Sequence, residues 1–239
     1  VVDTDSQGNC SDNLLTVVGI NGQWEGLTIS QLIDGKKTLY DAVFERDKYR
    51  SIDDYITNTK YDNLDLLAGD NRLSKKTSEL VTQMASFNFV YKKMLDEICD
   101  LKKYDFIILD SSPSASGENL QIYAGVDYVI IPTETCVRYT DAIDRVYKSI
   151  DSINCVRIEP QISVLGIIIN QVDIRTSIAK TVLPHLREEY GATVFKTIIP
   201  IDETVKQAEQ LTVPVGVYMP KGRASRAYDE FTKEVLDRI

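Results

Sequence analysis

The stretch FIILDSSP, residues 106–113, decides the fold, because four apolar residues run directly into an aspartate, Asp110. A run of this length is typical of a short strand that is buried on both faces. Other short, mainly apolar runs repeat the pattern, at residues 64–67, 128–131, 164–169 and 194–199. Amphipathic stretches that are typical of helices separate or follow these runs, at residues 76–102, 139–154, 177–190, 203–210 and 225–239.

This alternation of strands and helices predicts the fold class. Strands that are apolar on both faces and are separated by helices favour an α/β architecture, with a doubly wound, mainly parallel sheet and helices on both of its faces. The sequence contains no internal repeat, low-complexity tract or Pro/Ser-rich linker. We therefore expect residues 1–239 to form a single domain.

Residues at the strand ends mark the expected ligand site. Asp5, Asp110, Pro132 and Asn170 stand at, or one to two residues past, the end of an apolar run. In a doubly wound sheet, ligands bind beyond the carboxyl ends of the strands. Asp110 could hold a magnesium ion through its water shell. It could equally cap the turn that follows, as many strand-end aspartates do.

The charge balance limits the partners. Acidic residues outnumber basic ones by 36 to 27, so the molecule as a whole is repelled by nucleic acid and by anionic lipid. A DNA contact would have to come from a local basic patch, although a solvated surface of mixed charge explains each candidate taken singly. The candidates are Arg175, Lys180, Arg187, Lys221, Arg223 and Arg226.

Other features of the sequence favour a cytoplasmic protein. No stretch reaches the roughly 18 apolar residues of a membrane-spanning helix, and residues 1–5 have no basic region followed by an apolar run. The four cysteines are far apart and form no Cys-x-x-Cys pair, so we interpret them as reduced packing residues. His185 is the only histidine, and a surface role suits it better than catalysis.

Two polar segments make a family resemblance specific. The segment VVDTDSQGN, residues 1–9, resembles the Val-Asp-x-Asp-Pro-Gln-Gly-Asn switch of the ParA/MinD family of deviant-Walker ATPases, with Ser6 in place of proline. Residues 110–114 are similar to the Walker B segment of that family, Asp-x-Pro-Pro-Ser, with Ser112 replacing the first proline. Further matches follow in order, at residues 126–133, 165–170, 198–200 and 213–215.

The resemblance implies a role for five residues. Asp5 would be the switch carboxylate that orients the attacking water, and Asp110 would hold Mg²⁺, through water. Asn170, Pro200 and Asp202 would contribute to the pocket for the base. The cofactors would then be ATP or ADP with magnesium, and phosphoryl transfer would depend mainly on positioning and charge neutralisation.

The resemblance also implies partners. Members of this family act in plasmid or chromosome partition as nucleotide-switched ATPases. The expected partners are a second copy of the chain in an ATP-dependent homodimer, and a ParB-like centromere-binding adaptor. Nonspecific DNA binding is less expected, because residues 201–203 (Ile-Asp-Glu) stand where the DNA-binding members usually place an arginine. Membrane targeting is not expected, because residues 228–239 are mixed in charge rather than basic.

One departure concerns the phosphates. The family's Gly-rich loop, with its lysine and Ser/Thr, should precede Val1 by a helix and a strand, and residues 1–239 contain no Gly-x-x-x-x-Gly-Lys-Ser/Thr spacing. We therefore expect that the sequence is a piece of a longer protein, without the N-terminal strand and helix of the sheet. A parallel sheet that lacks an interior strand would leave backbone groups unpaired and apolar faces exposed.

Two alternatives remain open. The protein could be a non-hydrolysing interaction module that keeps the fold without the loop, or a MinD-like positioning ATPase. A Ser-His-Asp hydrolase is excluded, because no histidine lies at a plausible spacing from the serines at positions 111, 112, 114 and 116, and the Gly-x-Ser-x-Gly elbow is absent.

Overall fold

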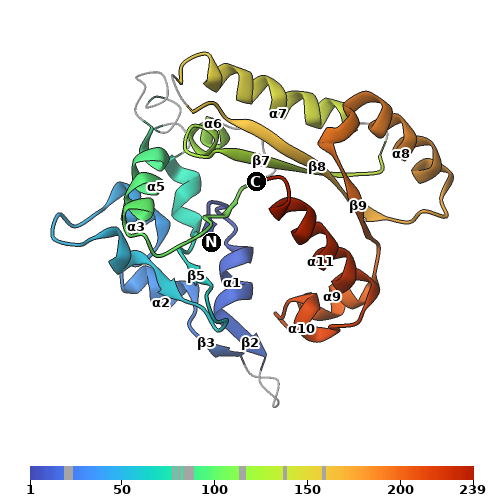
Figure 1. Ribbon diagram of the computed structural model, residues 1–239. Coiled ribbons are helices and arrows are strands. Elements are labelled where there is room, and N and C mark those ends of the chain that lie inside the picture. The colour runs from blue at the N-terminus through green and yellow to red at the C-terminus, as the bar shows by residue number, and fades with distance from the viewer. Residues whose placement is uncertain are drawn as a thin grey trace. The chain divides into compact units, whose positions relative to one another are not determined.

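The computed structural model describes residues 1–239 except 19–23, 77–78, 80–81, 83–88, 113–116, 137–138 and 158–159. The chain divides into two compact units, Val1–Val126 and Asp127–Ile239. They run from blue to green and from green to red in Figure 1. That the two units form a single domain stays a prediction.

A short parallel sheet organises the first unit. Strand β1 (Val2–Asp3) pairs in parallel with β6 (Leu109–Asp110), in the register Val2 to Leu109 and Asp3 to Asp110. On its other side, Val2 forms a parallel bridge with Leu67, directly after β5 (Asp65–Leu66). Strand β1 therefore lies between the β5 segment and β6, and the carboxyl ends of all three point to the same edge of the sheet.

Further elements of the first unit surround this sheet. Helices α2 (Ile29–Asp34) and α3 (Leu39–Phe44) begin at capping boxes, in which Thr28 pairs with Gln31 and Thr38 pairs with Asp41. The remaining elements are α1 (Asn9–Leu15), the antiparallel pair β2 (Thr16–Val18) and β3 (Trp24–Gly26), α2 (Ile29–Asp34), α3 (Leu39–Phe44), β4 (Thr57–Asn58), α5 (Val90–Asp100), α6 (Gly117–Tyr123), and 3-10 helices at Ile52–Tyr55 and Asn71–Lys76.

The predicted helix over residues 76–102 is interrupted at Phe89, although Glu79 and Thr82 before it are helical. Lys76 ends a 3-10 helix, and Phe89, with ψ of 85°, stands before the first residue of α5 in a non-helical conformation. Most of the residues between these two positions lie outside the described part of the chain. The amphipathic pattern that identified the helix is real within α5, whose buried face carries Tyr91, Leu95 and Ile98.

The β6 run has one covered face and one uncovered face. Ile107 and Leu109 pack against the core that α3 and α5 build around Val2 and Leu67. Phe106 and Ile108, which alternate with them, are 55% and 62% exposed. The prediction that this run is buried on both faces is therefore wrong for Phe106 and Ile108.

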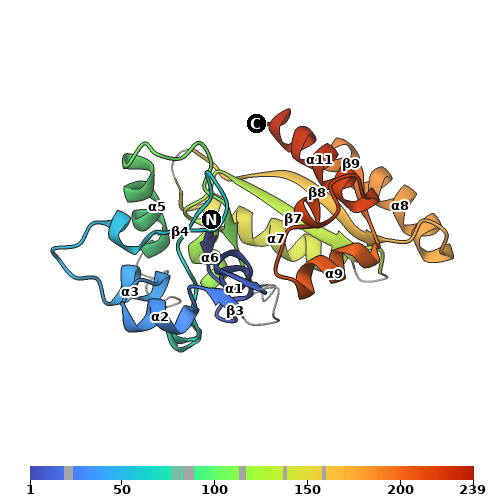
Figure 2. The same ribbon diagram turned by 90° about the horizontal axis from the view of Figure 1, so that it is seen from below.

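The second unit contains a larger parallel sheet, in the order β7-β8-β9. Ile167 and Ile169 on β8 (Ser163–Val172) pack towards α7 (Tyr139–Asn154) and α8 (Ser177–Tyr190), while Ile168 between them packs towards α11 (Arg223–Leu236). Figures 1 and 2 show α7 and α11 on opposite sides of this sheet. The elements are β7 (Tyr128–Glu134), α7 (Tyr139–Asn154), β8 (Ser163–Val172), α8 (Ser177–Tyr190), a 3-10 turn (Gly191–Thr193), β9 (Val194–Pro200), α9 (Glu203–Gln210), α10 (Val215–Tyr218) and α11 (Arg223–Leu236).

The predicted fold class is confirmed, because the chain is α/β with parallel strands and helices. The predicted strands over residues 128–131, 164–169 and 194–199 lie within β7, β8 and β9. The predicted helices over residues 139–154, 177–190 and 203–210 have the bounds of α7, α8 and α9. Polar residues at cap positions explain this agreement, since Thr176 and Asp202 accept hydrogen bonds at the starts of α8 and α9.

A buried ion network ties the first unit together. The Arg72 guanidinium donates to Asp70 and Asp41, with Nη2 at 2.9 Å from Oδ2 of each carboxylate. Asp41 and Asp70 are each 1% exposed. Burial acts to raise the pKa of Asp70, but the hydrogen bonds from Arg72 outweigh it and hold this pKa below its usual value. The network fixes the turn after β5 to the start of α3.

We predict that Arg72→Met strongly destabilises the first unit, because it leaves two buried carboxylates without their cation. The expected loss is about 3 kcal/mol, measured as the free energy of unfolding in urea. Arg175→Met is the matched control: Arg175 also forms a bidentate pair with an aspartate two residues before it, Asp173, but its side chain is 87% exposed. Equal losses in the two variants would contradict the prediction.

Candidate functional site

Three aspartates meet at the carboxyl edge of the first sheet. Asp3 ends β1, Asp110 ends β6 beside it, and Asp5 follows Asp3 by two residues. Thr4 holds this arrangement, because both its backbone N–H and its hydroxyl donate to the Asp110 carbonyl oxygen, at 2.9 and 2.6 Å. The sequence predicted Asp5 and Asp110 at this edge, and the structure brings them together.

The loop that carries Asp5 is a tight turn. The Asp5 carboxylate accepts the backbone N–H of Gln7 at 2.9 Å, and the Asp5 carbonyl accepts the N–H of Gly8 at 3.1 Å. Gly8 has φ of 68° and stands directly before α1, in the left-handed region that glycine adopts without strain. A Cβ at this position would lie 2.8 Å from Ile29 Cδ1. The local sequence thus specifies the turn and the direction of the Asp5 side chain.

Asp3 and Ser11 were missed as functional residues by sequence reasoning. Asp3 is fully buried and accepts three hydrogen bonds: from the backbone N–H of Asp5 at 3.1 Å, and from the N–H and hydroxyl of Ser11 at 2.9 and 2.6 Å. The available signal was an aspartate inside a strand, where a buried carboxylate needs several donors. Nothing in the sequence pattern identified Ser11 as the donor.

The electrostatics of this edge favour a cation. Partial burial, followed by the charges of Asp3 and Asp5, raises the pKa of Asp110, while the Cys10 thiol opposes this by a hydrogen bond. Burial also raises the pKa of Asp3, against the hydrogen bonds from Ser11. Burial, followed by the charges of Asp110 and Asp3, raises the pKa of the Cys10 thiol to about 12. Each of these shifts means that negative charge at this edge is destabilised in the folded chain.

The residues fit magnesium held through water rather than in a protein cage. Among the residues that the structure describes, no group of three or more His, Cys, Asp and Glu side chains is placed to hold a metal ion. Mg²⁺ keeps several waters and is usually bound by one or two carboxylates together with substrate phosphates. Asp110, which is exposed as a residue and lies beside two further carboxylates, suits that mode of binding.

The predicted base-binding residues lie at the carboxyl edge of the second sheet. Asn170 pairs with Glu134 across β7 and β8, and Val172 pairs with Pro200 across β8 and β9. The Asn170 side chain accepts the N–H of Gln171 at 2.9 Å, and Gln171 has a left-handed φ of 53°. A left-handed glutamine in a strand is a costly conformation of the kind that clusters at binding sites. Asn170 and Pro200 are therefore brought to one edge.

Asp202 has a structural task at the same edge. Its carboxylate caps α9 by accepting the backbone N–H of Thr204 at 3.0 Å and the Thr204 hydroxyl at 2.8 Å. Those hydrogen bonds lower the pKa of Asp202. Arg223 lies 3.7 Å from the same carboxylate. That Asp202 contributes to a pocket for the base stays a prediction. Its capping of α9 is by itself a structural reason for an aspartate at this position.

The candidate basic residues for DNA are mostly engaged with acceptors in the second unit. Arg175 pairs with Asp173, and Arg223 pairs with Asp202 and donates to the Ile201 carbonyl. Arg226 and Arg187 donate to the carbonyls of Lys221 and Lys196. The charge of two of these arginines is therefore offset locally, which weakens the field of a DNA-binding patch.

The other expectations about single residues have different outcomes. His185 is exposed on α8, and its Nδ1 lies 2.9 Å from the Tyr139 hydroxyl, as suits a surface residue. All four cysteines are free, but Cys99, Cys136 and Cys155 are exposed, so the expectation that they are packing residues is wrong for these three. Pro113, Ser114 and Ser116 lie outside the described residues. Within the described part of the chain, no helix is long and apolar enough to cross a membrane.

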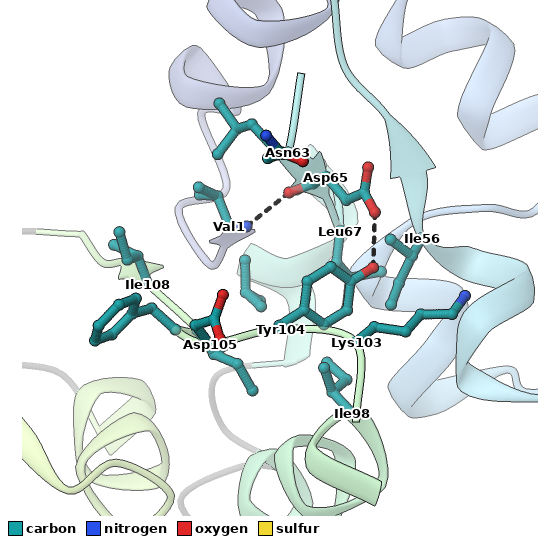
Figure 3. Close-up of a pocket in the computed structure, with 14 residues that line it drawn as sticks. Val1, Ile56, Asn63, Asp65, Leu67, Ile98, Lys103, Tyr104, Asp105 and Ile108 are labelled. Atoms are coloured by element: carbon teal, nitrogen blue, oxygen red, sulfur yellow. Dashed lines mark hydrogen bonds between the residues drawn. The ribbon is translucent and has the colours of Figure 1, made fainter. Parts of the chain in front are cut away.

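A cavity of about 590 Å³ lies in the first unit, at the opposite ends of the same strands (Figure 3). Tyr104 donates to the Asp65 carboxylate at 2.8 Å on its wall, and the Val1 amino group donates to the Asp65 carbonyl at 2.7 Å. Val1 and Phe106 begin the segments whose carboxyl ends carry Asp5 and Asp110. The cavity is therefore not part of the carboxylate site.

A parallel α/β fold with aspartates at the ends of its strands is typical of nucleotide-binding α/β proteins. The chain belongs to the AAA domain family (AAA_31), which residues 1–164 match. It is 24% identical over 238 residues to the chromosome partitioning protein ParA of Caulobacter vibrioides, covering 100% of this chain and 82% of the relative. It is 27% identical over 238 residues to the chromosome-partitioning ATPase Soj of Treponema pallidum, covering 100% of this chain and 85% of that one.

Other similarities extend this result. Two uncharacterized Mycobacterium tuberculosis proteins are 26% identical over 210 residues, which are 85% of this chain, and the chain spans only 62% of their length. Apo McdA from Cyanothece aligns with a TM-score of 0.76 at 17% identity, over 98% of this chain and 86% of McdA. MinD from Pyrococcus horikoshii with Mg-ADP aligns with a TM-score of 0.66 at 18% identity, over 98% and 81%. The resemblance to the ParA/MinD type of partition ATPase is confirmed.

We predict that Asp110→Asn makes the chain more stable at pH 7, because it removes a carboxylate whose pKa is raised in the folded state. A carboxyl group whose pKa is raised by folding destabilises the folded chain at a pH where it is ionised. Below its ordinary pKa of 3.8 it is protonated in both the folded and the unfolded chain, so it no longer affects stability. The gain should therefore shrink as the pH falls from 7 towards 4, as measured by urea midpoints. An equal, pH-dependent gain in Asp229→Asn, at an exposed position on α11, would contradict this interpretation.

Proposed function

We propose that the chain belongs to a cytoplasmic partition ATPase that binds ATP with magnesium, dimerises when ATP is bound and is reset by hydrolysis. The observation that carries this proposal is the placement of Asp5 two residues past the end of β1, beside Asp110 at the end of the adjacent parallel strand β6. Membership of the family and the similarity to ParA and Soj support it. The ATPase activity of the whole protein, its substrate and its partners are all part of the proposal.

Asp110 is the residue that would hold magnesium, through water, together with nucleotide phosphates. Bound Mg²⁺ would neutralise charge that develops on the phosphates during transfer. The raised pKa of Asp110 supports this role, because a cation beside Asp3, Asp5 and Asp110 would relieve their mutual repulsion. The Mg-ADP complex of MinD, which shares the fold, supports the choice of ligand.

Asp5 is the residue that would orient the attacking water. Its carboxylate stands in a turn fixed by the N–H groups of Gln7 and Gly8, so it keeps one direction relative to β1. Holding a reactant in the right geometry supplies a large part of the rate enhancement in phosphoryl transfer. One Asp5 oxygen accepts the Gln7 N–H, which leaves a carboxylate that can still accept a hydrogen bond from water.

The base would lie at the carboxyl edge of β8 and β9. Asn170 and Pro200 stand there, and the Asn170 side chain uses its oxygen for the Gln171 N–H. No described residue of the chain is hydrogen-bonded to the Asn170 amide nitrogen, so that nitrogen can donate to an acceptor on a purine ring. Asp202 would contribute mainly by capping α9 and so fixing the segment that follows Pro200.

The partners would be a second copy of the chain and a ParB-like adaptor bound at a centromere site, in plasmid or chromosome segregation. Contact with DNA through an adaptor is favoured over a direct contact, because Arg175 and Arg223 are paired with Asp173 and Asp202. The net charge of −9 also opposes direct binding. The similarity to ParA and Soj supports partition as the process.

We predict that Asp5→Ala lowers kcat for ATP hydrolysis by about 100-fold or more, because the attacking water loses its acceptor. Nucleotide affinity should change little, since this interaction matters mainly in the transition state. Turnover is measured at saturating ATP and magnesium, and affinity by calorimetry, on the whole protein with any residues that precede Val1. Asp12→Ala, which removes an exposed carboxylate on α1, is the matched control.

Three outcomes separate the alternatives. Loss of turnover in Asp5→Ala with ATP binding retained, and wild-type turnover in the control, would support the switch ATPase. An equal loss in both variants would contradict the role of Asp5. Absence of ATP binding by the whole wild-type protein would overturn the ATPase and favour the non-hydrolysing interaction module.

A further inference from the structure

Asp3 stands at the centre of a hydrogen-bond network behind the Asp5 turn. One carboxylate oxygen of Asp3 accepts the backbone N–H of Asp5, and the other accepts the N–H and hydroxyl of Ser11. Both Asp3 and Ser11 are 0% exposed. A buried carboxylate with three donors is fixed in place, because losing any donor would leave part of its charge unsatisfied.

Ser11 also links this network by a hydrogen bond to a third segment of the chain. Its hydroxyl donates to Asp3 at 2.6 Å and accepts the backbone N–H of Gly69 at 3.0 Å. Since a hydroxyl has one hydrogen, the bond from Gly69 obliges Ser11 to direct its hydrogen at Asp3. The network therefore joins the end of β1, the first turn of α1 and the segment after β5, three parts of the chain that are distant in sequence.

The contact at Gly69 is too close for a side chain. A Cβ on Gly69 would lie 2.7 Å from the Asp3 carbonyl oxygen, 2.9 Å from the Asp5 carbonyl oxygen and 3.1 Å from Asp3 Cγ. The backbone after β5 therefore lies directly against the backbone of residues 3–5. Next to Gly69, Asp70 is held by Arg72, so the support behind the Asp5 turn is itself anchored.

We infer that Asp3 and Ser11 are positioning residues for Asp5: their hydrogen bonds hold the Asp5 turn, residues 5–8, against Gly69 and thereby set the turnover rate. This inference rests on the proposed function, in which Asp5 orients the attacking water. Neither residue is exposed, so neither would touch the nucleotide. Their contribution is the geometry of Asp5, and displacement of a catalytic group by about 1 Å can cost up to roughly 100-fold in rate.

Ser11→Ala tests the inference, because it removes the hydroxyl and leaves the backbone N–H bond to Asp3. In the whole protein, kcat should fall about tenfold or more, while KM for ATP stays within about threefold. Ser11→Thr, which restores a hydroxyl, should recover most of the lost kcat. A merely structural role would lower the melting temperature without this split between kcat and KM.

Amide hydrogen exchange supplies a readout that does not need ATP hydrolysis. In Ser11→Ala, the amides of Gly69 and Asp5 should exchange about tenfold faster, the factor that corresponds to one lost hydrogen bond. Thr59→Ala is the matched control, because the Thr59 hydroxyl, like that of Ser11, accepts one backbone N–H, of Tyr61, and donates to oxygen, here the carbonyls of Leu64 at 2.6 Å and Tyr61 at 3.3 Å. The control should leave the exchange of Gly69 and Asp5 and the value of kcat unchanged.

Each outcome decides one point. Unchanged exchange at Gly69 and Asp5 in a folded Ser11→Ala variant would overturn the inference, whatever the ATPase does. Faster exchange with wild-type kcat would overturn the link to turnover. If the wild-type protein does not hydrolyse ATP, the proposed function fails, and faster exchange alone would still support the positioning of the turn. If Ser11→Ala does not fold, the same measurements are made on Ser11→Cys, because a thiol is a weaker donor and acceptor than a hydroxyl.

Discussion

The parallel pairing of β1 with β6 is the constraint on which the first unit depends. Its register sets Asp3 opposite Asp110, and the Thr4 bonds to the Asp110 carbonyl then fix the point at which the chain leaves the sheet. Asp5 is carried to the same edge as a consequence. Three carboxylates at one edge repel one another, so the site is less stable than a neutral edge would be, and it gains stability from a bound cation.

Two buried networks support this edge in different ways. Around Asp70 and Asp41, the guanidinium of Arg72 compensates the carboxylate charges. Around Asp3, neutral donors from Ser11 and the backbone do so, and the pKa of Asp3 is raised rather than lowered. The first network is therefore a stable anchor. The second keeps uncompensated negative charge beside Asp110, as a site for a divalent cation requires.

The sequence was sufficient for the elements whose pattern is local. The helices over residues 139–154, 177–190 and 203–210 were predicted correctly, because apolar spacing and polar caps specify a helix by themselves. The break before α5 was not predicted, because the amphipathic spacing continues through Phe89, whose backbone is not helical. Asp5 and Asp110 could be predicted because each follows an apolar run. Ser11 and Gly69 could not, since their contact depends on the packing of segments 58 residues apart.

The composition of the Asp5 turn explains why its support lies in hydrogen bonds. Ser6 stands where the resembling family has a proline, and a proline would stiffen the turn by fixing φ. In this chain, the turn is instead restrained by Asp5 accepting from Gln7 and Gly8, and by Asp3 accepting from Asp5. Hydrogen bonds can open and close, whereas a proline ring cannot. The order of this turn therefore depends on hydrogen bonds, among them the bond to Asp3, whose carboxylate Ser11 holds in place.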